Sequence, residues 1–158
     1  MPLAIDSVVH LAIRTSDLDR SLRFYCDTLG FPEMMRHFYT DGSVLCVFVR
    51  ASERQYIEIF PNGEGEVAGP NAVGLDHVCF VVPDVEETEQ TLGSLGVELT
   101  KSFDTPHGRT LFITDPDGTT IEFEGRKAAD AEITAADEVR EGGRPTEVHT
   151  AFIAPATQ

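Results

Sequence analysis

The stretch Asp76-His77-Val78-Cys79-Phe80-Val81-Val82 has a counterpart near the start of the chain, Val9-His10-Leu11-Ala12-Ile13. In both stretches one histidine stands early in a run of apolar residues that is typical of a strand. Each histidine is followed, at a similar distance, by a second strand-like stretch with a single central glutamate between apolar residues, at residues 55–60 and 119–124. The chain therefore repeats one pattern of histidine and glutamate, which predicts two similar modules.

The predicted elements come in the same order in both halves. Strands are expected at 8–14, 33–39, 44–50 and 55–60 and again at 75–82, 97–103, 109–114 and 119–124, with helices at 17–29 and 85–95. Either Ser16 or Asp17 can cap the start of the first helix and Asp84 that of the second, and Gly30 and Gly96 suit left-handed backbone after their ends. Each half is then a βαβββ unit, which is too small to be stable alone. We expect an α+β fold in which paired βαβββ modules form a cupped mixed sheet with helices on its outer face.

The repeat divides the chain into three segments. Residues 1–66 form the first module, residues 67–125 form the second, and residues 126–158 are a C-terminal extension of unassigned role. The two modules together make one domain over about residues 7–125. Within the extension, the pattern predicts a short helix at 134–141 and a strand at 148–153.

Strand alternation separates the apolar positions from the polar ones. The apolar positions fall on one face, suited to packing under the helices. The opposite face carries His10, Arg14, Glu58, Asn62, His77 and Glu122. One such histidine or glutamate is usually structural, but a buried carboxylate is costly unless it is paired or bound to metal, and these residues occur at matching places in both halves. The sequence therefore favours a metal site.

The predicted metal ligands are His10, Glu58, His77 and Glu122. Two imidazoles and two carboxylates without a thiolate admit Ni²⁺, Zn²⁺, Co²⁺, Fe²⁺ or Mn²⁺. An octahedral ion with these four ligands keeps two positions for a substrate with neighbouring oxygens, and such an ion acts as a Lewis acid.

Composition excludes several other classes of function. The 158 residues contain 27 acidic and 12 basic side chains, a net charge of −15, so a phosphate backbone would be repelled and no nucleic-acid partner is expected. No apolar run is long enough for a membrane helix, and the first residues do not look like a secretory signal. We expect a cytoplasmic protein with a small-molecule substrate. The three cysteines have no CxxC spacing, which argues against a disulfide framework or a zinc knuckle.

Two longer motifs resemble a known family. HLAIRTSDLDRSLRFYCDTLGF at residues 10–31 and DPDGTTIE at 115–122 look like the vicinal oxygen chelate superfamily. This superfamily includes glyoxalase I, methylmalonyl-CoA epimerase, extradiol dioxygenases, and the fosfomycin and bleomycin resistance proteins. The resemblance covers about residues 7–125. It is strongest to glyoxalase I, in which each module gives one histidine and one glutamate to the metal.

The resemblance implies a glyoxalase I-like lyase or isomerase. Such an enzyme acts on the hemithioacetal of a 2-oxoaldehyde and a thiol cosubstrate, through an enediolate. One divalent ion per site is implied, with Ni, Zn or Co favoured and Fe or Mn as alternatives. Glu122, or else Glu58, would carry the proton, and Arg14 and Asn62 would hold the thiol. The family commonly builds its site from two chains, so a homodimer is expected.

Two alternatives follow from the same family. Members that only bind a small molecule, such as an antibiotic, often lose metal ligands, whereas all four are present in this chain. An extradiol-type dioxygenase would need Fe²⁺ or Mn²⁺ with Glu58 disengaged. In that case acid–base groups would be needed, and the candidates are His37, Tyr39, Tyr56 and His107.

Overall fold

The computed structural model describes residues 3–69 and 72–140, and it confirms the α+β fold of two βαβββ modules. The first module contains β1 (His10–Arg14), α1 (Leu18–Leu22), β2 (Glu33–Phe38), β3 (Val44–Arg50) and β4 (Tyr56–Phe60). The second contains β5 (Val78–Val82), α2 (Val85–Ser94), β6 (Lys101–Thr105), β7 (Gly108–Thr114) and β8 (Thr120–Gly125). A third helix, α3 (Arg126–Arg140), follows β8 directly.

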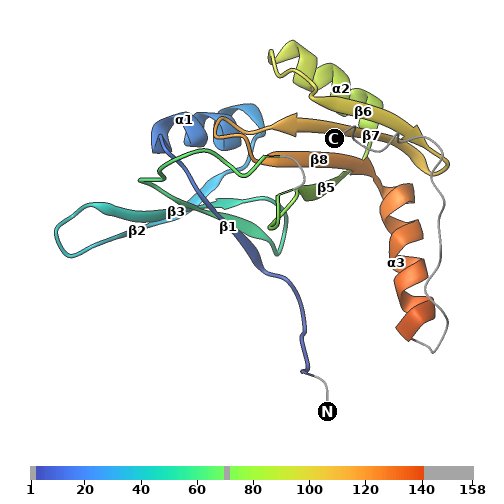
Figure 1. Ribbon diagram of the computed structural model, residues 1–158, viewed down its shortest axis with the longest axis horizontal. Helices are drawn as coiled ribbons and strands as arrows, with labels where there is room; N and C mark the ends of the chain where they lie inside the picture. The colour runs from blue at the N-terminus through green and yellow to red at the C-terminus, as the bar shows by residue number, and fades with distance from the viewer. Residues whose placement is uncertain (1–2, 70–71, 141–158) are drawn as a thin grey trace.

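The strands form two separate four-stranded sheets, in the orders β1-β4-β3-β2 and β5-β8-β7-β6. Strand β1 is parallel to its neighbour β4, and β5 is parallel to its neighbour β8. All other neighbouring strands are antiparallel. The mixed strand pairing expected from the sequence is therefore present in two sheets, one in each module (Figure 1). Strands β1 and β5 lie at the edges of their sheets, and within residues 3–69 and 72–140 no strand pairs with their outer sides.

The predicted helix caps are confirmed. The carboxylate of Asp17 accepts a hydrogen bond of 3.0 Å from the Arg20 amide, and that of Asp84 accepts one of 2.9 Å from the Glu87 amide. Gly30 and Gly96 have φ angles of 75° and 74°, the left-handed backbone that glycine tolerates best. After α1 the first helix continues as a π-helical segment, Arg23–Thr28, so the predicted helix is present but more widely wound in its second half.

The core lies where strand alternation predicts it. Its fully buried side chains come from the helix-facing side of both sheets and from the helices, and include Leu22, Tyr25, Val47, Val49, Ile57, Ile59, Leu92, Leu111, Ile113 and Ile121. The apolar side chains of the edge strands β1 and β5, such as Ile13, Val78, Phe80 and Val82, are only partly buried against this core, and Val9, just before β1, is 46% exposed.

Hydrogen bonds join the two modules at the turn between β7 and β8. The hydroxyl of Thr15 donates to Asp117 Oδ2 at 2.6 Å, and the Ser16 amide and hydroxyl bind Asp117 Oδ1 at 3.1 and 2.5 Å. Arg20 Nη2 donates to Asp117 Oδ1 at 2.9 Å. The buried hydroxyl of Tyr25 donates to the Asp115 carboxylate at 2.9 Å. We call these contacts the module joint.

Three elements begin three or more residues from their predicted starts, and one of them is β5, which begins at Val78 rather than at residue 75 and so leaves His77 just outside the strand. Strand β6 begins at Lys101 rather than at residue 97, because Val97 and Leu99 pack against the core and the Val97 amide bonds to the Leu92 carbonyl at 2.9 Å, which closes α2. Helix α3 begins at Arg126, eight residues before the predicted start at 134. The strand predicted at 148–153 lies outside the described residues.

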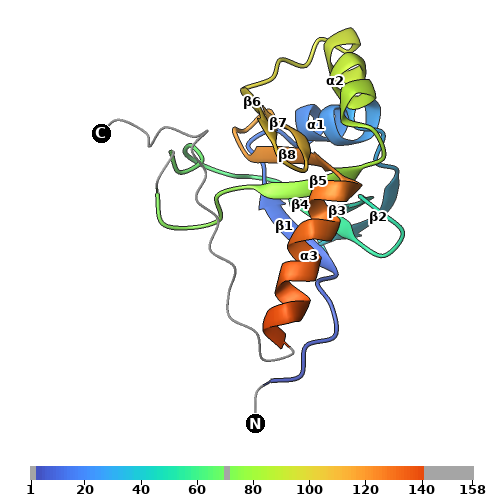
Figure 2. The same ribbon diagram turned by 90° about the vertical axis from the view of Figure 1, so that its right-hand side faces the viewer.

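Helix α3 lies on the opposite side of the sheets from α1 and α2 (Figures 1 and 2). Its first turn buries Ala128 and Ala129, and the helix contacts β5 and β8. It therefore covers part of the polar face of the second sheet. None of the helices in the described part of the chain is both long and apolar enough to span a membrane.

Candidate metal centre

The first pair of predicted ligands lies on the two parallel strands of the first sheet. His10 begins β1, and Glu58 lies in the middle of β4, paired with Ala12. His10 Nε2 is 3.9 Å from Glu58 Oε2, and the imidazole stacks on the Tyr56 ring at 5.2 Å between centroids. The Glu58 side chain is 17% exposed, so this carboxylate is largely shielded from water. We call His10 and Glu58 the first half-site.

The second pair repeats this arrangement with closer contact. His77 lies just before β5, and Glu122 lies on β8, paired with Cys79. His77 Nε2 is 2.7 Å from Glu122 Oε2. The other ring nitrogen of His77, Nδ1, is 2.7 Å from the carboxylate of Asp76. We call His77 and Glu122 the second half-site.

The structure brings the four ligands together as pairs and not as one cluster. In residues 3–69 and 72–140, three or more metal-binding side chains come within 4.8 Å of one another only at Cys79, Glu122 and Glu124. That group touches the second half-site but contains no residue of the first. One chain therefore presents two separate pairs of donors.

The carboxylates of the second sheet lie in an electrostatically unfavourable place. Burial raises the pKa of Glu122, the nearby Glu132 of α3 raises it further, and His77 opposes the shift. The pKa of Glu124 is raised by burial and by the charges of Glu132 and Glu122. The Cys79 thiol also has a raised pKa, caused by burial and then by Glu122. A cation at this place would offset the repulsion among these acids.

Phenylalanines flank both glutamates. Phe48 of β3 pairs with Glu58, and Phe112 of β7 pairs with Glu122. The His77 and Phe112 rings meet edge to face at 5.9 Å. Sequence reasoning did not single out these two rings, although each stands at the same distance before its glutamate and the internal repeat could have revealed them. Their position predicts an apolar wall beside each pair of donors.

Arg14 is the last residue of β1, and Asn62 follows the end of the neighbouring strand β4. Arg14 Nη1 donates to the Pro61 carbonyl at 2.9 Å, and the guanidinium lies over the Phe60 ring at 5.3 Å. Asn62 has a φ of 62°, which is the left-handed backbone that asparagine adopts in turns. Both side chains are exposed.

The acid–base candidates of the dioxygenase alternative are scattered. His37 packs on Phe48 at 4.8 Å, and Tyr56 stacks on His10, so both belong to the first half-site's surroundings. Tyr39 is 55% exposed and lies just past the end of β2. The side chain of His107 is exposed in the turn between β6 and β7, in the other module.

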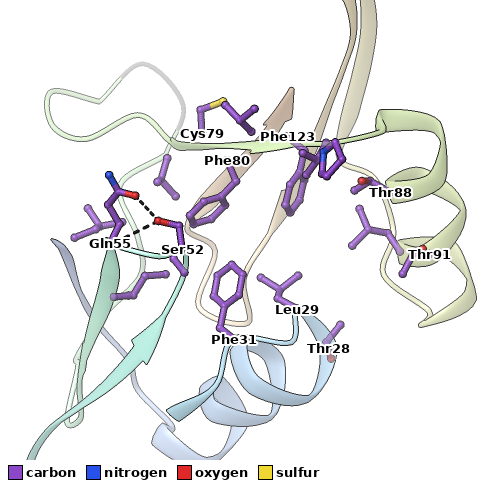
Figure 3. A pocket seen from close by; sticks show the side chains of 18 of the residues that line it. Thr28, Leu29, Phe31, Ser52, Gln55, Cys79, Phe80, Thr88, Thr91 and Phe123 are labelled. Atoms are coloured by element: carbon purple, nitrogen blue, oxygen red, sulfur yellow. Dashed lines mark hydrogen bonds between the residues drawn. The ribbon is translucent and has the colours of Figure 1, made fainter. Parts of the chain in front are cut away.

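A cavity of about 800 Å³ lies between the modules. Its walls come from all of β5, from Phe123 of β8, from α2, from the chain after α1, and from β1 and the 51–57 segment of the first module. The Phe31 and Phe80 rings meet edge to face in its wall, with 5.4 Å between centroids, and Phe123 lies beside them (Figure 3). His10 reaches its lining, whereas neither glutamate does. The cavity is mainly apolar, and Cys79 of its lining is within 4.8 Å of Glu122.

The donor chemistry fits a divalent ion. Each half-site offers one imidazole nitrogen and one partly buried carboxylate, and together they make an N₂O₂ set. The 2.7 Å between His77 Nε2 and Glu122 Oε2 is a hydrogen-bond distance, so an ion bound by both atoms would move them slightly apart, to roughly 3 Å.

Comparison with known proteins identifies the family. Residues 7–123 match the model of the Glyoxalase/Bleomycin resistance protein/Dioxygenase superfamily. The chain belongs to this superfamily. A probable lactoylglutathione lyase of Synechocystis is 34% identical to this glyoxalase-superfamily chain over 123 residues, which are 73% of this chain and 92% of that protein.

Two further relatives have similar names. The lactoylglutathione lyase of Neisseria meningitidis serogroup A is 29% identical over 133 residues, covering 80% of this chain and 95% of its own. Among solved structures, the trypanothione-dependent glyoxalase I of Leishmania major superposes with a TM-score of 0.66 at 26% identity, covering 87% of this chain and 99% of its own. The superfamily resemblance expected from the sequence is therefore confirmed.

Proposed function

We propose that this protein is a metal-dependent lyase of the glyoxalase I type. The observation that carries the proposal is the repeated pairing of one histidine with one partly buried glutamate, at 3.9 Å in the first half-site and 2.7 Å in the second. Relatives named lactoylglutathione lyase support the same reaction class. A bound divalent ion would polarise the two neighbouring oxygens of a 2-oxoaldehyde–thiol adduct and so acidify the adjacent C–H.

The protein's own residues supply proton transfer and orientation. We assign the proton transfer to Glu122, because its carboxylate is partly buried and its raised pKa favours a base that can also hold the proton. Glu58 is the second candidate for this role. His10 and His77 hold the ion, and Phe48 and Phe112 exclude water beside it. Arg14 and Asn62 are assigned to the thiol part of the substrate.

We further propose that each complete centre is shared between two chains. The half-sites of one chain do not form one cluster of donors, and the outer edges of β1 and β5 are unpaired among the described strands. If β1 of one chain lies beside β5 of a second, a first half-site faces a second half-site of the other chain. A homodimer would then contain two equivalent centres.

The direct test is metal analysis followed by an activity assay. The purified protein should contain one Ni, Zn or Co ion per chain and should isomerise methylglyoxal in the presence of a thiol. Glutathione should be compared with other thiols. Absence of bound metal after growth with these ions, together with no turnover for any thiol, contradicts the proposal. Iron with oxygen uptake on catechols would identify a dioxygenase instead.

The apolar cavity supports a second candidate function. A pocket of about 800 Å³ lined by Phe31, Phe80 and Phe123 has the size and character of a small-molecule site. A metal-free binder of an apolar compound, such as an antibiotic, would use it. Tight binding of such a compound without metal would favour this candidate over the lyase.

A further inference from the structure

The two half-sites differ in what holds their histidines. Asp76 Oδ2 is 2.7 Å from His77 Nδ1, while Glu122 Oε2 is 2.7 Å from His77 Nε2. In the first module the residue before His10 is Val9, whose side chain cannot accept a hydrogen bond. Both modules therefore contain the histidine and glutamate ligands, but only the second has a carboxylate at the position before the histidine.

Both ring nitrogens of His77 face a carboxylate at 2.7 Å, Nδ1 facing Asp76 and Nε2 facing Glu122. An ionised carboxylate only accepts hydrogen bonds, so these two contacts alone do not choose the tautomer. An ion bound beside Glu122 would need the lone pair of Nε2, and the ring proton would then be on Nδ1, where Asp76 accepts it. Carboxylates that bind the remote nitrogen of a metal-ligating histidine fix the ring and increase its basicity.

The histidine of the first half-site is held differently. The His10 ring stacks on Tyr56 at an interplanar angle of 23°, which limits rotation of the ring but does not choose its tautomer. Its Nε2 is 3.9 Å from Glu58, so this pair is also less closely set than His77 and Glu122. The second half-site is thus better arranged for metal binding than the first, because its histidine and glutamate are closer together and its histidine is held by a carboxylate.

We propose that Asp76 is a positioning residue that fixes His77 for metal binding and makes the second half-site the stronger anchor of the ion. This inference rests on the proposed function. The Asp76 side chain is 81% exposed, so its effect should lie near the lower end of the 10- to 100-fold range found for such partners. An exposed pair contributes little to folding, so Asp76 acts through the ion and not through stability.

The test is Zn²⁺ affinity of the full chain, measured by competition with a chromophoric chelator. Asp76→Ala should weaken Zn²⁺ binding about tenfold, and Asp76→Glu should recover most of the loss. Asp27→Ala, which removes an exposed acid on the helix side, should bind Zn²⁺ like the wild type. Without metal, Asp76→Ala should unfold at the same denaturant concentration as the wild type. In the Zn²⁺-loaded protein, the NMR signal of the His77 Nδ1 proton should be protected from exchange with water in the wild type and should exchange faster in Asp76→Ala.

The variant His77→Ala distinguishes failure of the metal centre from failure of the role of Asp76. His77→Ala should lose most Zn²⁺ affinity. If His77→Ala loses it while Asp76→Ala binds as tightly as the wild type, the positioning role is wrong and the metal centre stands. If His77→Ala binds Zn²⁺ like the wild type, the metal centre itself is wrong, and the role of Asp76 falls with it.

Discussion

The hydroxyl of Thr15, in the first module, donates a 2.6 Å hydrogen bond to the carboxylate of Asp117, in the second. Burial raises the pKa of Asp117, but hydrogen bonds from Ser16 and Thr15 outweigh it and lower this pKa to about 2. The Asp117 side chain is only 13% exposed. The module joint is therefore built around an ionised carboxylate shielded from water.

Neutralising this carboxylate should weaken the fold. A folded-state pKa near 2 against an ordinary value of 3.8 gives stability that is complete above pH 3.8 and is lost as the pH falls through 2. Asp117→Asn should therefore lower the free energy of unfolding by about 2 kcal/mol at pH 7, and the difference should shrink toward pH 2. Urea unfolding at several pH values measures this, with Asp27→Asn as an exposed control. A constant difference down to pH 2 would contradict the assignment.

Tyr25 should stabilise the same joint through its hydroxyl. The ring is 1% exposed, and the hydroxyl donates to Asp115 at 2.9 Å. Tyr25→Phe keeps the ring packing and removes the donor to a carboxylate, so it should cost about 1.5–3 kcal/mol of unfolding free energy. Thermal unfolding is the measurement. Phe24→Leu tests packing alone on the same helix, and equal stability of Tyr25→Phe and wild type would exclude a role for the hydroxyl.

Two variants that are each inactive should complement one another if the centres are shared. A His10→Ala chain lacks a first half-site, and a His77→Ala chain lacks a second. In a mixed dimer one centre has lost both histidines, and the other has both. Co-refolding the two variants should restore one metal ion and one active centre per mixed dimer. Pairing of the modules within each chain predicts no recovery at any mixing ratio.

Glu122→Gln should separate metal binding from proton transfer. The amide keeps the size of the side chain and one oxygen donor but cannot act as a base. Turnover of the hemithioacetal should fall by about 10²- to 10⁴-fold while metal remains bound. Glu58→Gln is the matched variant in the other half-site. Full turnover of Glu122→Gln would assign the proton transfer to Glu58.

Removal of metal should lower stability as well as activity. An ion that binds only the folded protein adds about 2.7 kcal/mol when its free concentration is about 100 times its dissociation constant. Dialysis against a chelator should therefore lower the melting temperature, and adding Ni²⁺ or Zn²⁺ should restore it. The double variant His10→Ala, His77→Ala serves as the control, and its melting temperature should not respond to either ion.

The features that depend on local sequence could be predicted well. Asp17, Asp84, Gly30 and Gly96 act within one helical turn, and their roles follow from residue type and spacing alone. The pairing of each histidine with its glutamate also followed, because a parallel pair of strands with alternating faces leaves few possibilities. The internal repeat in the sequence predicted the two similar modules.

The features that depend on contact between the modules could not be predicted. The Asp-Pro-Asp-Gly stretch at 115–118 lies in the turn between β7 and β8, but the contact of Asp117 with Thr15 spans 102 positions of the chain. The separation of the half-sites likewise depends on how the two sheets are oriented, and alternation within one strand says nothing about that. The sequence predicts the start of α3 eight residues too late. The alanines at 128 and 129 favour a helix as soon as β8 provides a surface to bury them, and that surface is not visible in the local sequence.

The outer edges of β1 and β5, which no other described strand pairs with, carry a risk of aggregation. An open strand edge can pair with any exposed strand, and Val9 and Val81 add apolar side chains there, 46% and 44% exposed. The net charge of −15 opposes such contacts by mutual repulsion, and salt weakens that repulsion. The acidity of the chain, which has no assigned part in the chemistry, thus opposes precipitation through these open edges.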